Sequence, residues 1–273
     1  MRWELQYASL LQQLVAFGHD VDSREGPVKE LSPAHVSAYV NGWHKIAGRG
    51  GSGEFAEAEQ LCYLAGAEPD VLAKLVPRYR EMAGWMDRWP GAYGPRLVSS
   101  LPLVVEELAT RPNSRRAVAP IWRPLDLANA VRKPRMPEPC TLNLQFLVRH
   151  GQLHGHATMR SCDAWYGIYY DVPAFMFLTR CVGWCLGLRA GAVHLGTPSL
   201  HLYERHWDPA TNVRPEVTET RDLFKWAWDD LGKLPWRKFE PGEPVAPVDP
   251  AVATARWLML VRWAQARLEG KGA

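Results

Sequence analysis

Two short segments near the middle of the chain hold the residue types best suited to covalent chemistry. In the first, Cys140 follows a segment rich in Pro and Arg and precedes a strand-like run. A thiolate is a strong nucleophile where neighbouring cations lower the pKa of the thiol. Several cations precede it in the sequence: Arg115, Arg116, Arg132, Lys133 and Arg135. Cys140 is therefore a candidate nucleophile, although a lone cysteine is more often a buried, unreactive residue.

The second segment is Arg160-Ser161-Cys162-Asp163, which follows another strand-like run. A guanidinium group pairs with phosphate oxygens through two parallel hydrogen bonds, and a neighbouring hydroxyl adds another. The segment is a candidate phosphate clamp, and an ion pair on the surface is the alternative.

The histidines raise the question of a metal site. His154 and His156 share one face of a strand-like segment, with His150 and Cys162 nearby in the sequence, so a zinc site is conceivable. The spacing matches no structural zinc pattern, and we expect no metal. No P-loop, GxGxxG or GxSxG motif is present, which disfavours the common nucleotide-hydrolase, dehydrogenase and hydrolase templates.

Composition narrows the class of protein. The chain has 273 residues, a net charge of +3, 47% hydrophobic and 22% charged residues. These values indicate a folded protein without the basic field that DNA binding requires. There is no long apolar run and no signal peptide, so we expect a cytoplasmic protein without a membrane span. Five cysteines, an odd number, disfavour a disulfide framework, and thirteen Trp suit stacking on flat ligands as well as core packing.

The ends of the chain are predicted to be mainly helical. Apolar residues at helical spacing predict helices over 3–18, over 54–65 with an end at Gly66, and over 253–270. A further helix over 71–86 is interrupted by Pro77.

The remaining segments complete an α+β pattern. We expect loops around a short strand or helix over 19–53, and mostly loop over 111–139. The segments 141–148 and 152–159 alternate like strands around His150-Gly151 and predict a hairpin. The segment 172–188, which contains Cys181 and Cys185 one helical turn apart, is typical of a buried helix, and 192–206 predicts another strand pair. Without repeats or a clean linker, one domain over 1–273 is favoured.

Taken in order, several motifs resemble those of the thymidylate synthase family, including its branch of pyrimidine hydroxymethylases. The resemblance covers about residues 5–205, and the C-terminal helical segment diverges. The matching motifs are DSREG at 22–26, EQLCYLAG at 59–66, GAYG at 91–94, NSRR at 113–116, EPC at 138–140, RSCDAWYGIYYDVP at 160–173 and HLY at 201–203.

The resemblance implies a fold and a set of catalytic roles. The fold is α+β, with a mixed β-sheet covered by helices and two subunits packed sheet to sheet as a homodimer. Cys140 would attack C6 of a pyrimidine nucleotide, and Glu59 would organise a proton relay through water. Asp171 would face the base.

The resemblance also implies binding residues for a nucleotide and for 5,10-methylenetetrahydrofolate. Those for the 5′-phosphate are Arg24, Arg160 and Ser161, joined by Arg115 and Arg116 from the partner subunit. Those for the sugar hydroxyl are His201 and Tyr203. Those for the folate are Asp163, Gly167, Tyr170 and Trp85, with Trp89 nearby.

Asp171 indicates which base is bound. Uridylate-methylating members of the family resemble this sequence but have Asn at that position, and an amide offers the donor and acceptor that match uracil. A carboxylate can accept hydrogen bonds from the N4–H group of cytosine and from N3 once it is protonated. Facing O4 of uracil, the same carboxylate leaves two acceptors opposed, at a cost of about 1–3 kcal/mol. The residue therefore favours a cytidylate.

Other departures concern the product. Thr141 follows the nucleophile where methylating members often have His, Tyr169 replaces the usual Pro, and the C-terminal segment lacks the family's apolar tail. A site that admits water would give a hydroxymethyl product. We therefore predict a CMP or dCMP 5-hydroxymethylase, and the Ala-, Arg-, Trp- and Pro-rich composition favours the CMP enzymes of nucleoside-antibiotic pathways, of the mildiomycin type.

Two alternatives remain open. One is methylation of dUMP or dCMP on the same fold, and the other is an inactive homologue that binds nucleotide. The sequence does not distinguish ribose from deoxyribose.

Overall fold

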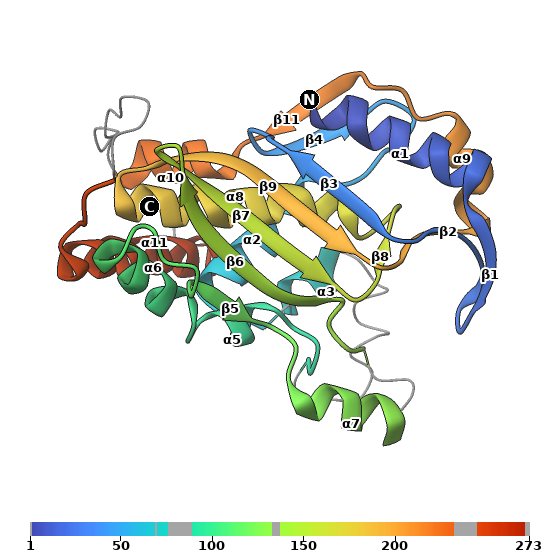
Figure 1. Cartoon of the computed structure of the whole chain (residues 1–273). Coiled ribbons are helices and arrows are strands. Elements are labelled where there is room, and N and C mark those ends of the chain that lie inside the picture. Colours follow the sequence, from blue (N-terminus) through green and yellow to red (C-terminus); the bar gives the residue numbers. More distant parts are fainter. Residues whose placement is uncertain (1, 69, 76–88, 133–136, 232–244, 271–273) are drawn as a thin grey trace.

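The described residues form a mixture of helices and β-sheets. The computed structural model describes residues 2–68, 70–75, 89–132, 137–231 and 245–270 (Figure 1). Within this part of the chain the strands form sheets of five, four and two strands. This arrangement agrees with the mixed sheets and helices predicted from the sequence.

The five-stranded sheet is the framework of the molecule, in the order β3-β9-β7-β6-β5. Its neighbours are antiparallel except for β7 and β9, which are parallel. The strands are β3 (Ala34–Ala38), β5 (Val118–Pro120), β6 (Thr141–Arg149), β7 (Gln152–Met159) and β9 (Arg189–Thr197).

The predicted hairpin is confirmed. Strands β6 and β7 pair from Arg149 opposite Gln152, and the two turn residues, His150 and Gly151, have φ of 51° and 72°. Two positive φ values are typical of the tight turn that matches the twist of an antiparallel pair. The turn fixes which residues of each strand face each side of the sheet.

Helices cover one face of this sheet. The long helix α8 (Ile168–Leu186) packs against β7 and β9, and α2 (Gly53–Ala65) and α11 (Pro250–Leu268) pack on α8. In Figure 1 the sheet lies in front, and α8 and α2 run behind it. Helix α2 begins with a hydrogen bond from the Phe55 N–H to the Ser52 hydroxyl and ends at Gly66, whose φ is 70°. Both ends agree with the predicted boundaries.

The four-stranded sheet brings distant motifs together. Its order is β1 (His19–Ser23), β2 (Gly26–Leu31), β10 (Leu200–Tyr203) and β8 (Cys162–Asp163). Strands β10 and β8 are parallel and place His201 opposite Asp163. The prediction of a strand pair over 192–206 is therefore wrong in its pairing, because β9 and β10 belong to different sheets.

Two segments predicted to be mainly loop contain regular structure. The segment 19–53 forms β1, β2, β3 and β4 (Trp43–Ile46), and β4 pairs with β11 (Val217–Arg221). These strands lack a clear apolar alternation because most of their residues are half-buried or exposed. The segment 111–139 contains β5 and α7 (Pro124–Arg132). In α7 only Asp126 is buried.

The remaining helices fill the ends of the molecule. They are α1 (Trp3–Phe17), α3 (Asp70–Leu75), α5 (Gly94–Leu97), α6 (Leu101–Thr110), α9 (Trp207–Thr211) and α10 (Leu223–Leu231), with a short 3₁₀ turn at Glu204–His206. Pro77 lies outside the described residues. No described helix has the length and apolar character needed to span a membrane.

The core accounts for part of the unusual composition. Trp3, Trp43 and Trp257 are fully buried. All five cysteines are free, and Cys181 and Cys185 are buried in α8, as their spacing predicted.

Candidate active site

One cavity of about 490 Å³ collects much of the predicted chemistry. Its walls come from α2, the start of α8, the segment 89–94 and the loop 137–140. The predicted site residues that line it are Glu59, Trp89, Cys140, Asp163, Gly167, Tyr170, Asp171 and Tyr203. Helix, sheet and loop residues more than a hundred positions apart in the sequence therefore share one pocket.

The loop that carries Cys140 is held in place by hydrogen bonds from its neighbours. The Arg160 N–H donates to the Cys140 carbonyl at 2.8 Å, and the Arg160 guanidinium donates to the carbonyls of Pro139 and Glu138 at 2.9 and 3.2 Å. On the other side, the Thr141 N–H donates to the Tyr93 hydroxyl at 3.0 Å. These bonds fix the thiol at the start of β6.

The thiol is not activated in the way the sequence predicted. Burial raises the pKa of Cys140, Arg160 opposes this rise, and the nearby carboxyl groups of Asp171 and Asp163 add to it. Among the described cations of the upstream segment, Arg115 and Arg116 are exposed and line no wall of the pocket. The resting residue is therefore a thiol, and its proton must leave when it attacks.

A buried pair of carboxyl groups faces the thiol from the helices. Burial, reinforced by the charge of Asp171, raises the pKa of Glu59 to about 8. Burial, reinforced by Asp163, raises the pKa of Asp171 to about 7. The Glu59 Oε2 atom is buried without a hydrogen-bond partner. Near neutral pH this pair therefore holds protons that it can pass to a ligand.

The start of α8 fixes the distance between the acidic residues. The Asp163 carboxylate accepts hydrogen bonds from the N–H groups of Trp165 and Tyr166 at 2.7 and 3.1 Å. A Cβ on Gly167 would lie 2.8 Å from the Asp163 carbonyl and 3.3 Å from the Asp171 carboxylate. Glycine at 167 therefore permits this close turn.

Two aromatic side chains that line the cavity, Tyr170 and Trp89, are held in place by hydrogen bonds. The Tyr170 hydroxyl accepts a hydrogen bond from the Ser52 N–H at 3.0 Å, and its ring stacks on Trp43 at 6.2 Å. The Trp89 indole N–H donates to Asp70 at 3.3 Å. Trp85 lies outside the described residues.

Several predicted phosphate and sugar residues do not line this cavity: Arg24, Arg115, Arg116, Arg160, Ser161 and His201. Arg24 pairs with Glu25 at 3.3 Å, and Arg116 pairs with Glu107 at 3.1 Å. His201 lies behind Tyr203, edge to face at 5.2 Å.

The charge of the cavity is one-sided. No described Lys or Arg lines the cavity. The side chains of five acidic residues do: Glu25, Glu59, Glu138, Asp163 and Asp171. A phosphate bound at this cavity therefore needs cations from its rim or from another chain.

Sequence reasoning assigned no role to Glu138, which the structure places beside the nucleophile. Both of its carboxyl oxygens are buried without a hydrogen-bond partner, and burial, followed by the charge of Asp126, raises its pKa. Its place in the EPC motif was the available signal. Tyr63, Tyr93 and Met159 also line the cavity and were missed, because apolar and aromatic residues resemble core positions.

A metal centre finds no support. No group of His, Cys, Asp or Glu among the described residues could hold a metal ion. His154 and His156 do share a strand face, but Cys162 is buried in another sheet.

Comparison of the chain with models of known protein families identifies its family. A family model described as thymidylate synthase matches residues 74–222, more than half of the chain. The chain belongs to the thymidylate synthase family. The matched range includes Cys140, Asp163, Asp171 and His201 and begins after Glu59. Members of the thymidylate synthase family bind a nucleotide and folate, and membership supports a folate-dependent one-carbon transfer to a nucleotide.

Proposed function

We propose that this member of the family is a CMP or dCMP 5-hydroxymethylase. The observation that carries the proposal is the buried Asp171, which stands where uridylate-methylating relatives have Asn and lines the same cavity as Cys140. The carbon of the new CH₂OH group comes from methylenetetrahydrofolate, the oxygen comes from water, and the C5 proton of the base is lost. No oxidation of the folate is required.

Asp171 can supply what cytosine needs. With a pKa near 7, its carboxyl group donates a hydrogen bond to N3 and accepts one from N4–H. When Cys140 adds to C6, N3 becomes basic and takes the proton. The resulting carboxylate then accepts hydrogen bonds from both N–H groups, which stabilises the covalent adduct. A protonated Asp171 can also pair with O4 and N3–H of uracil, so the opposed acceptors expected from the sequence do not decide the base. The preference for cytidylate comes instead from the proton that N3 takes in the adduct, which N3 of uracil cannot accept.

Glu59 serves as the second proton donor. Its raised pKa keeps it protonated at neutral pH, and its unpartnered oxygen is free to bind a water molecule or the base. We assign it the relay of protons to and from the ring.

The phosphate would lie at the rim of the cavity. Arg24, Arg160 and Ser161 are the candidates from the same chain, and Arg115 and Arg116 would come from a partner subunit. Two observations support the partner: no described cation lines the cavity, and both arginines are exposed at the start of β5. His201 and Tyr203 would hold the sugar hydroxyl, since Tyr203 lines the cavity and His201 contacts its ring.

The residues present fit a folate. Aromatic side chains of Trp89, Tyr166 and Tyr170 form a wall for a flat ring, and the carboxylate of Asp163, with Gly167 beside it, can accept hydrogen bonds from ring N–H groups. When bound, methylenetetrahydrofolate supplies the one-carbon unit. These residues orient it against the nucleotide.

We assign a hydroxymethyl product because Thr141 follows the nucleophile where methylating members often have His. Helix α11 packs on α2, α6 and α8, and none of its residues lines the cavity. Tyr169 does not bear on this point, because its hydroxyl donates to the carbonyls of His44 and Gly50 inside the core.

The test combines product mass with base selectivity. Wild-type protein should convert CMP or dCMP to a 5-hydroxymethyl product without forming dihydrofolate, whereas methylation would form it. Asp171→Asn should shift the kcat/KM ratio of uridylate to cytidylate by about 10- to 100-fold, because the amide cannot give N3 a proton. An unchanged ratio would refute this account, and binding without any turnover would favour an inactive homologue.

A further inference from the structure

The face of the five-stranded sheet opposite α8 is free of acidic residues. None of its five strands contains Asp or Glu. A Cβ on Gly155 would meet the Thr179 hydroxyl of α8 at 2.3 Å, so Gly155 faces the helix. His154 and His156, one position to either side, therefore face away from it.

Histidines from three strands gather on this face. The ring of His194 on β9 lies 4.6 Å from His156, 5.6 Å from His154 and 6.1 Å from His35, and the rings are roughly stacked. The His194 ring also exchanges hydrogen bonds with the Ser37 hydroxyl at 2.8 Å and with the His154 ring at 3.4 Å. We call these four residues, His35, His154, His156 and His194, the histidine cluster.

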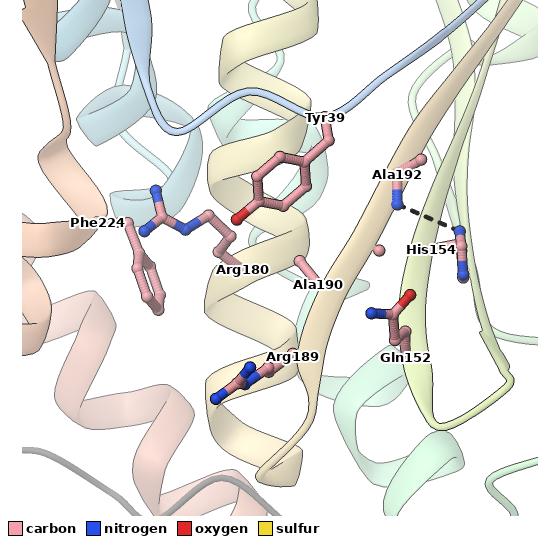
Figure 2. Close-up of a pocket in the computed structure, with 9 residues that line it drawn as sticks. Tyr39, Gln152, His154, Arg180, Arg189, Ala190, Ala192 and Phe224 are labelled. Atoms are coloured by element: carbon pink, nitrogen blue, oxygen red, sulfur yellow. Dashed lines mark hydrogen bonds between the residues drawn. The ribbon is translucent and has the colours of Figure 1, made fainter. Parts of the chain in front are cut away.

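The charged groups around the cluster are cations. Arg149 on β6 and His150 in the hairpin act on His154. Figure 2 shows the hollow beside the cluster, with His154 on one side of β9 and Arg180 and Arg189 on the other. The hollow also contains Tyr39, Gln152 and Phe224, and no described acidic residue lines it. Arg180 comes from α8, on the other face of the sheet, and pairs with Asp222 at 2.6 Å.

The occupant of this face is a second copy of the chain. The inference rests on the homodimer of the proposed function, in which the partner supplies Arg115 and Arg116. Those two residues begin the edge of this same sheet, where the Gln145 side chain on the outward face donates to the Arg115 carbonyl at 2.7 Å. A face without carboxylates, on which burial disfavours the charged forms of His154, His156 and His194, also has the low charge that interface cores favour.

We infer that the histidine cluster makes docking of the second copy depend on protonation, so that the dimer forms at neutral pH and separates in mild acid. In the dimer two clusters would be enclosed on facing sheets. Protonation then places several positive charges in a desolvated space with no carboxylate to pair with them. Separation would also remove the partner's arginines from each phosphate site.

The direction of the titration agrees with this inference. Burial, followed by the charge of neighbouring histidines, lowers the pKa of His154 and His194 and lowers that of His156 to about 4. Enclosure by a second copy lowers these values further, so the separated chains bind protons more readily. The dissociation constant therefore rises about tenfold per pH unit for each proton taken up on separation, once the pH falls to the lowered pKa values of the separated chain.

The experiment measures subunit mass and dissociation constant by analytical ultracentrifugation from about pH 7.5 to about pH 4.5, because the pKa values of the histidines lie below 6.5 in the separated chain. Wild-type protein should show a dissociation constant that rises at least about tenfold over this range, with circular dichroism unchanged. The triple variant His154→Gln, His156→Gln and His194→Gln should lose most of this rise, since Gln keeps hydrogen bonds without titrating. His19→Gln, an exposed residue on β1, is the matched control and should behave as wild type.

Each outcome decides the inference. The inference is overturned if the wild-type dissociation constant is the same at the highest and lowest pH. It is also overturned if the triple variant keeps the full pH-dependent rise in dissociation constant. If the triple variant does not fold, His194→Gln alone should still reduce the slope. A protein that is monomeric at pH 7.5 overturns both the inference and the partner-borne arginines, whereas a pH-dependent dimer without turnover of CMP or dCMP overturns only the proposed reaction.

Discussion

The cavity and the open face of the central sheet are opposites in charge. Five carboxyl groups and no described Lys or Arg line the cavity. Four histidines lie on the sheet face, whose strands contain no Asp or Glu. Each region concentrates one kind of titratable group, and burial disfavours the charged forms of Glu59 and Asp171 in the cavity and of His154, His156 and His194 on the sheet.

One physical cause acts on both regions with opposite sign. Burial disfavours the charged form, so it raises the pKa of Glu59 and Asp171 and lowers the pKa of His156 and His194. Glu59 in the cavity and His156 on the sheet face are therefore neutral at pH 7. The acids keep protons that a reaction can use, and the histidines leave a surface that another chain can cover.

A third buried site shows what a partner changes. Burial alone would raise the pKa of Asp126, but hydrogen bonds from Arg96, one of them 2.8 Å long, and from the Arg123 N–H lower it. This pair stays charged and ties α7 to α5. No opposite charge among the described residues acts in this way on Glu59 or Asp171, and we connect their raised pKa values with function.

The largest effect is expected when the Cys140 thiol is removed and the titratable groups of the cavity and of the sheet face are left unchanged. Cys140→Ala should lower kcat by at least about 10³-fold, because the covalent adduct cannot form. Nucleotide binding and the pH dependence of assembly should persist. Cys181→Ala, which removes a thiol from the core of α8, should retain turnover.

The same variant can connect the two regions. Mixing inactive Cys140→Ala with an inactive Arg116→Ala variant should restore part of the activity if the sheet faces pair, because one site of the mixed dimer has both groups intact. No recovery after subunit exchange would mean that Arg116 acts within its own chain. The rate of formation of 5-hydroxymethylcytidylate is the measurement.

The next test concerns the protons of the cavity. Glu59→Gln should lower kcat by about 10²- to 10⁴-fold, as expected for loss of a general acid. In the wild type, kcat/KM should fall as pH rises through about 8, where Glu59 loses its proton. The Glu59→Gln variant should lack this fall in kcat/KM. If the variant keeps the fall, the group that titrates near pH 8 is not Glu59.

Much of the site could be predicted because its motifs are local. The turn at His150-Gly151, the end of α2 at Gly66 and the short run around Asp171 are set by neighbouring residues, so the sequence indicated them directly. The strands of 19–53 were missed because few of their residues are buried, and a periodic pattern arises only where one face is enclosed.

The parts that could not be predicted depend on distant contacts. Upstream arginines seemed able to activate Cys140, yet the fold places Arg115 and Arg116 on the far edge of the sheet and leaves Arg160 bound to the loop carbonyls. His194 joins His154 and His156 only through the parallel pairing of β7 and β9. The pairing of β7 with β9 cannot be inferred from the spacing of the histidines in the sequence.

The smallest effect we predict is on the stability of the fold. Its pH dependence has opposite signs for the cavity carboxyl groups and for the histidines. Glu59 and Asp171 have ordinary pKa values of 4.5 and 3.8, which the fold raises to about 8 and 7, so the folded chain binds more protons and loses stability as pH rises through that range. The histidines have an ordinary value of 6.5 that the fold lowers, so they cost stability as pH falls below it.

The melting temperature should therefore pass through a maximum near pH 6 to 7 and fall on both sides, by about 2–4 °C for each kcal/mol lost. Glu59→Gln should flatten the alkaline side and steepen the acidic side, because the contribution of Glu59 declines from about pH 4.5 to about pH 8. His156→Gln should flatten the acidic side alone. If either substitution flattened both sides, the two regions would be titrating as one unit rather than as independent sites, because distant sites add without coupling.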